Sequence, residues 1–124
     1  MPLGTIFEHH EEHDALSFYM VAISLRNARL VFITDHETRL PALGNPAIGT
    51  PTRVASAPVV ASALPFTNHK YEILAKSIAE ILARKLNAPV FLFLDVHFES
   101  MDVNATRTLK LAAGRFCDEM VPSN

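Results

Sequence analysis

The chain contains one cysteine and no tryptophan in 124 residues. A single thiol cannot form an internal disulfide, so the sequence excludes a disulfide-stapled domain and favours a reducing compartment. We therefore expect a cytoplasmic protein, with the nucleus as the other compartment that this composition allows. Cys117 falls on the apolar side of a predicted C-terminal helix, which indicates a small buried residue rather than a nucleophile.

The chain also lacks an excess of charge of one sign and a long apolar run. Its 11 Lys and Arg residues and 13 Asp and Glu residues are scattered and give a formal net charge of −2. A nucleic-acid partner is not expected, because such a surface needs clustered basic residues. No apolar run approaches the roughly 20 residues of a membrane span, and residues 1–14 lack the pattern of a secretory signal, so we expect no membrane association.

Complete catalytic and metal-binding motifs are missing as well. Residues 9–13 read His-His-Glu-Glu-His, which does not have the H-E-x-x-H spacing of a zinc protease. Residues 44–50 have the glycine spacing of a phosphate-binding loop, but Thr50 stands where that loop needs a lysine. We therefore expect a protein that is not an enzyme, with no catalytic residue, no cofactor and no metal ion.

Residues 72–96 carry the clearest structural signal. An apolar stripe at helical spacing consists of Leu74, Ile78, Ile81 and Leu82. Asn87 can adopt the left-handed conformation that ends a helix, and Pro89 prevents its continuation. The pattern predicts a helix that ends near Leu86, followed by a strand over residues 90–98 in which no polar residue precedes Asp95.

The remaining segments add strands before this helix and a second helix after it. Residues 17–25 and 28–34 predict a β-hairpin, and five prolines restrict residues 41–65 to interrupted or edge strands, the best of them over residues 57–64. Predicted helix N-caps are Thr67 or Asn68, and Asn104.

The predicted order is β-β-β-β-α-β-α. It describes one α+β domain over residues 17–121, a mostly antiparallel sheet with two helices packed on one face. Residues 1–16 form a flexible arm or an edge strand.

Three predicted strands are apolar on both faces, which two helices on one side cannot cover. If Arg26-Asn27 is a two-residue turn, Val21 and Ile23 share a face with Leu30 and Phe32, and we assign that face to the helices. The other face has an apolar centre with polar residues around it, which is typical of an interface. The residues predicted to bind a partner are Phe18, Met20, Ala22, Arg29, Val31, Ile33, Phe91 and Phe93. Val31→Glu is accordingly expected to abolish pairing and to leave the fold intact.

Several segments resemble the proteasome assembly chaperone 4 family. In Asn45-Pro46-Ala47-Ile48-Gly49-Thr50-Pro51, the first, third and last residues match the family's Asn-Leu-Ala-Val-Ala-Met-Pro stretch. Residues 58–64, Pro-Val-Val-Ala-Ser-Ala-Leu, are similar to its Pro-Val-Ser-Thr-Ser-Leu strand. Ile81-Leu82-Ala83-Arg84-Lys85 and then Val90-Phe91 look like its basic-ended helix and following Val-Phe strand.

The resemblance implies a non-enzymatic chaperone of 20S proteasome assembly. Such a protein forms a heterodimer with a second small chaperone of similar fold, and the pair binds an α-type proteasome subunit and promotes formation of the α-ring. No cofactor is implied.

Two other functions remain open from the residues alone. One is a small oligomeric α+β enzyme with ligand sites between subunits, for which Arg29, Arg53 and Asp95 are the suggestive side chains. The other is a dimerising scaffold module.

Overall fold

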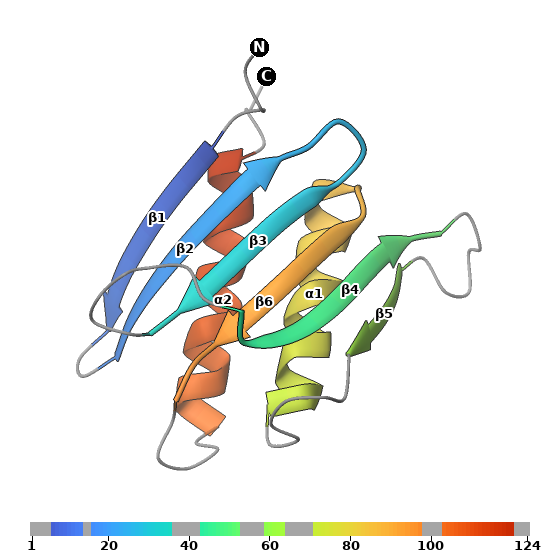
Figure 1. Ribbon diagram of the computed structural model, residues 1–124. Coiled ribbons are helices and arrows are strands. Elements are labelled where there is room, and N and C mark those ends of the chain that lie inside the picture. The colour runs from blue at the N-terminus through green and yellow to red at the C-terminus, as the bar shows by residue number, and fades with distance from the viewer. Residues whose placement is uncertain are drawn as a thin grey trace.

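The computed structural model describes residues 6–13, 16–35, 43–52, 59–63, 71–97 and 103–120. These ranges contain a six-stranded sheet and two helices (Figure 1). The strands are β1 (Ile6–His13), β2 (Leu16–Ser24), β3 (Arg29–Thr34), β4 (Asn45–Pro51), β5 (Val59–Ala63) and β6 (Val90–Asp95). The helices are α1 (Glu72–Leu86) and α2 (Val103–Met120).

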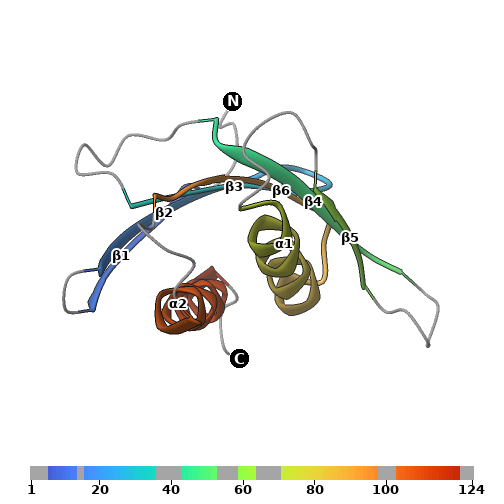
Figure 2. The same cartoon turned by 90° about the horizontal axis from the view of Figure 1, so that it is seen from below.

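The sheet is mostly antiparallel, and its strand order is β1-β2-β3-β6-β4-β5. Only β3 and β6 run parallel, with Arg29 opposite Val90 and Thr34 opposite Asp95. The sheet arches over α1 and α2, which both lie on its concave side (Figure 2). The predicted α+β class, with two helices on one face of a mostly antiparallel sheet, is therefore confirmed. The order has one more strand than predicted, because β1 forms within residues 1–16.

The predicted hairpin register is confirmed. Ser24 pairs with Arg29, and the Leu25 N–H donates to the Ala28 carbonyl at 2.9 Å, so Arg26-Asn27 is a two-residue turn. A two-residue turn fixes which residues share a face, because side chains alternate along each strand.

Both predicted helices form, and each buries one apolar side. In α1, Leu74, Ile78 and Leu82 are buried, and Asn87 ends the helix at φ 50°. This left-handed residue confirms the predicted helix stop. The predicted cap at Thr67 or Asn68 lies outside the described residues. In α2 the buried residues include Leu109, Ala112, Ala113, Phe116, Cys117 and Met120. That helix begins at Val103, so Asn104 lies inside its first turn instead of capping it.

β4 is paired on both sides although it contains two prolines. Pro46 lies beyond the last β4–β5 pair, which joins Ala47 and Ala63. Pro51 lies beyond the last β4–β6 pair, which joins Gly49 and Val90. The prolines therefore flank the doubly paired segment 47–49 and leave its hydrogen-bond ladder intact.

None of the helices in the described ranges has the length and apolar character needed to cross a membrane.

Candidate partner-binding face

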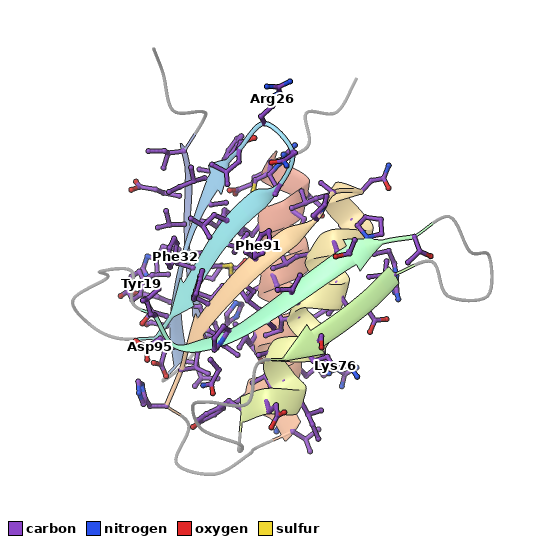
Figure 3. All side chains as sticks on the ribbon, turned by 45° about the vertical axis from the view of Figure 1, so that its right-hand side comes forward. Tyr19, Arg26, Phe32, Lys76, Phe91 and Asp95 are labelled. Atoms are coloured by element: carbon purple, nitrogen blue, oxygen red, sulfur yellow. The ribbon has the colours of Figure 1, made fainter. Side chains whose placement is uncertain are left out.

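The convex side of the sheet is the candidate functional site, because neither described helix covers it (Figure 2). We call it the outer face. The strand registers place on it the apolar residues Tyr19, Val21, Ile23, Leu30, Phe32, Pro46, Ile48, Phe91 and Phe93. Figure 3 labels Tyr19, Phe32 and Phe91 on this side of the sheet, and Lys76 on α1 on the other.

Aromatic side chains dominate the centre of the outer face. Phe32 lies opposite Phe93 across the β3–β6 pair, and their rings stack with centroids 5.2 Å apart. Phe91 pairs with Leu30 on one side and with Ile48 on the other, and it is 40% exposed. A monomer rarely leaves a contiguous apolar surface of this kind in water, so the outer face has the character of an interface.

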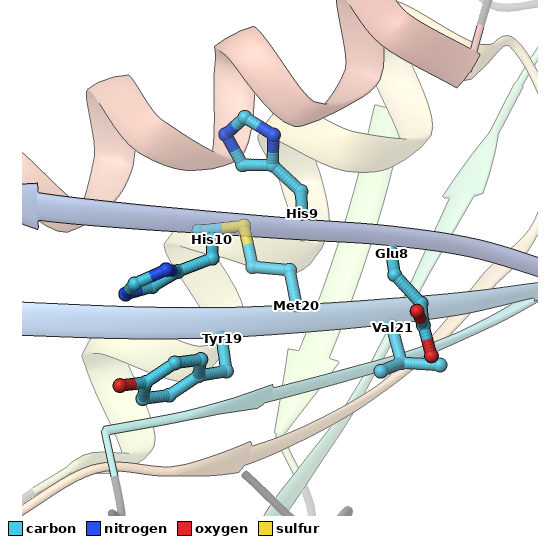
Figure 4. A pocket seen from close by; sticks show the side chains of 6 residues that line it. All are labelled: Glu8, His9, His10, Tyr19, Met20 and Val21. Atoms are coloured by element: carbon cyan, nitrogen blue, oxygen red, sulfur yellow. The ribbon is translucent and has the colours of Figure 1, made fainter.

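The β1 side of the outer face is mostly polar, with Ile6, which is 62% exposed, at one end. His10 stacks on Tyr19 with ring centroids 4.4 Å apart, and its Nε2 lies 3.4 Å from a carboxylate oxygen of Glu12. Glu8 lies beside Val21. Glu8, His10, Tyr19 and Val21 are among the residues that line a shallow depression of ≈ 250 Å³ between β1 and β2 (Figure 4). An apolar centre with a polar rim is the usual anatomy of a protein–protein interface.

The structure corrects the predicted assignment of the two faces. Five residues predicted to bind a partner lie in the core on the helix side and are at most 1% exposed: Phe18, Met20, Ala22, Val31 and Ile33. Arg29 is also on that side, at the hairpin turn, where its guanidinium donates to the Ala28 carbonyl at 3.1 Å. Phe91 and Phe93 do lie on the outer face. They share it with Leu30 and Phe32, for which the sequence predicted contact with the helices.

The inversion has a physical reason. Alternation along the strands shows correctly which residues share a face. Both faces of the hairpin are apolar, however, so alternation does not show which face meets the helices. A usable signal lies in residues 45–51, where Ala47 and Gly49 alternate with Pro46 and Ile48. A Cβ on Gly49 would lie 2.4 Å from the Ala79 carbonyl oxygen of α1, so the face with the smallest residues is the one that a helix approaches.

The side chains suggested for an enzymatic site are not brought together. Arg29 and Asp95 lie at opposite ends of the β3–β6 pair, and Arg53 lies outside the described residues. Asp95 instead accepts a hydrogen bond from the Thr34 hydroxyl at 3.5 Å, and its Oδ1 lies 3.4 Å from His97 Nε2.

Beneath the sheet, the inward side chains of β1 form an ionic cluster with α2. Both Glu11 oxygens accept from the Arg115 guanidinium, and they also lie 2.7 Å from the Nε2 atoms of His9 and His13. The other His9 ring nitrogen lies 2.9 Å from Glu119. The hydrogen bonds from Arg115, helped by those from the two histidines, lower the pKa of Glu11 to about 2 although burial opposes this. This cluster attaches the edge strand to the last turns of α2.

The cluster predicts a specific dependence of stability on pH. The folded pKa of Glu11 lies below its ordinary value of 4.5, so its contribution is complete above pH 4.5 and is lost as the pH falls towards 2. Glu11→Gln should therefore be less stable than the wild type in urea at about pH 7, and the gap should close at about pH 2. An equal gap at both pH values would contradict the ionic role of Glu11.

Cys117 of α2 is not suited to act as a nucleophile. Burial raises the pKa of the Cys117 thiol to about 12, so the sulfur is protonated at neutral pH and is a poor nucleophile. Within the described ranges, no three His, Cys, Asp or Glu side chains are arranged to hold a metal ion.

Comparison with known proteins gives an informative likeness among solved structures. No protein-family model matches the chain. No curated protein matches it either. Among solved structures, the chain is similar to one described as the crystal structure of a novel chaperone complex for yeast 20S proteasome assembly. The two chains are 16% identical with a TM-score of 0.65, and the match covers 96% of this chain and 95% of the other. At this identity the likeness shows the fold alone, which the two chains share over nearly their whole lengths.

Proposed function

We propose that this chain is a non-enzymatic chaperone of 20S proteasome assembly that pairs through its outer face with a second small chaperone of similar fold. Two independent observations support the proposal: the resemblance of residues 45–51, 58–64 and 81–91 to the chaperone family, and the fold likeness to a yeast assembly-chaperone chain. The pair would bind an α-type 20S subunit and promote formation of the α-ring, as the family resemblance implies.

The observation that carries the pairing is the outer face, which neither of the two described helices covers. Its centre holds Phe32, Phe91 and Phe93, and among the outer-face residues described for β3 and β6 the charged one is Asp95, at the end of β6. Aromatic enrichment and depletion of charge are what distinguish the centre of an interface from ordinary surface. A standard interface needs about 800 Å² from each partner, which a face of several strands can supply.

The charges around the outer face favour a different partner over a second copy of this chain. Among its described residues, the carboxylates are Glu8, Glu12 and Asp95, and neither Lys nor Arg occurs. Two copies packed face to face would enclose acidic rims of the same sign, which opposes association. A similar sheet with basic residues at its rim would complement this one, so a heterodimer follows.

The test is recovery of the full chain from its own cells at native abundance, followed by identification and mass measurement of what it carries. The expected result is a one-to-one complex with a second small protein, together with an α-type 20S subunit. A homotrimer would favour the enzyme with ligand sites between subunits, and a homodimer would favour the scaffold module. Either of these two masses, with no proteasome subunit recovered, would contradict the proposal.

A further inference from the structure

Among the described residues, the helix layer contains cations that have no ion-pair partner. Four ion pairs involve its exposed charged residues: Arg84–Glu80, Lys85–Asp118, Arg115–Glu11 and His9–Glu119. Three exposed or half-exposed cations, Lys76, Arg107 and Lys110, have no ion-pair partner within the described ranges. Together α1 and α2 carry six Lys and Arg side chains and four Asp and Glu side chains, a small excess of cations that would attract a partner that carries carboxylates.

Two of these cations border exposed apolar side chains on α2. Val103, Thr106, Arg107, Lys110 and Leu111 recur at helical spacing and together line a depression of ≈ 450 Å³. We call these five residues the α2 stripe. Val103 is 78% exposed and Leu111 is 56% exposed, although the opposite side of the same helix is fully buried.

The α2 stripe is bounded at one end. Gly114 continues its helical spacing, but the Lys85 ammonium of α1 lies 3.6 Å from the position of a Cβ at Gly114. Lys85 also donates to Asp118 at 3.3 Å, so its charge is already paired. An occupant of the depression would therefore meet free cations only at Arg107 and Lys110 among the described residues that line it.

We propose that the α2 stripe docks a protein segment that presents carboxylates next to a large apolar side chain. Arg107 and Lys110 would bind the carboxylates, and Val103 and Leu111 would contact the apolar group. The apolar contacts favour a protein over a nucleic acid, whose backbone would use the cations but leave Leu111 in water. The stripe and the outer face lie on opposite sides of the sheet, so both can be occupied in one molecule. This docking does not depend on the proposed pairing.

Fluorescence anisotropy of the full chain with three synthetic helical peptides tests the proposal. The first peptide carries Glu and Leu on one face, the second replaces Glu with Lys, and the third replaces Leu with Ser. Saturable binding is expected for the first peptide alone. Lys110→Glu should weaken that binding by about tenfold or more, and Leu111→Ser should also weaken it.

Two matched variants serve as controls, because they make the same chemical changes on α1, outside the depression. Lys76→Glu and Ile73→Ser should leave the affinity within about twofold of the wild type. Phe91→Glu on the outer face should likewise bind the first peptide normally, which separates this site from the pairing surface.

Four outcomes would overturn the proposal. Equal losses in Lys76→Glu and Lys110→Glu would indicate a general electrostatic field, and equal binding of the Leu-to-Ser peptide would indicate attraction to charge alone. Displacement of the first peptide by a single-stranded oligonucleotide at lower concentration would indicate a nucleic-acid site. Self-association of the wild type that Lys110→Glu abolishes would identify the occupant as a second copy of this chain.

Discussion

Phe91→Glu should fold like the wild type and fail to pair, whereas Leu92→Glu, one residue further along β6, should fail to fold. Phe91 is 40% exposed on the outer face, so a carboxylate there reaches water in the free chain and is buried unpaired only in a complex. Leu92 lies in the core on the helix side of the sheet and is 0% exposed. An uncompensated buried charge costs about 3–5 kcal/mol, a large part of the roughly 5–15 kcal/mol that stabilises a domain.

Val31→Glu should behave like Leu92→Glu, because Val31 pairs with Leu92 and is also 0% exposed. The sequence alone led to the opposite expectation for this variant, a native fold without pairing. Circular dichroism and urea unfolding measure the fold, and co-expression with the partner followed by gel filtration measures pairing. A Phe91→Glu chain that still elutes with its partner at full complex size would refute the assignment of the outer face, as would a stably folded Leu92→Glu chain.

The fold class and the hairpin could be predicted because their signals are local. Arg26-Asn27 between two apolar runs sets a register in which Val21 pairs with Phe32, and Asn87 ends α1 in the left-handed conformation. The residues of the hairpin alone do not predict which of its faces meets the helices, since that depends on which apolar set fits against them. Met20 and Val31 meet that requirement only through contacts with segments distant in the sequence.

The role of the histidine-rich segment, residues 9–13, could not be predicted from the sequence either. As a run of polar residues it indicates solvated surface, and alternate residues of β1 are indeed exposed. The other residues face α2, where Glu11 meets Arg115 across a separation of 104 residues in the chain. No local pattern specifies such a contact, because it exists only after the edge strand and the last helix are brought together.

Gly49→Val should destabilise the domain by about 3 kcal/mol, the upper part of the usual range for overpacking a close contact. Gly49 lies in the part of β4 that pairs with strands on both sides, and it faces α1. A Cβ there would lie 2.4 Å from the Ala79 carbonyl oxygen and 3.0 Å from the Ala83 Cβ. Backbone atoms of a helix cannot rotate aside, so α1 would have to move away from the sheet and lose packing along its apolar stripe.

Gly114→Ala is the matched control, because the same kind of change at a second buried glycine should have the opposite sign. A Cβ on Gly114 would meet only the end of the Lys85 side chain, at 3.6 Å from Nζ, which is an ordinary contact with a flexible group. Alanine is favoured over glycine inside a helix by about 0.5–1 kcal/mol, so this variant should gain stability of that size. Urea unfolding of both variants measures the difference. If Gly49→Val unfolded at the wild-type urea concentration, α1 would not pack as closely on β4 as this structure places it.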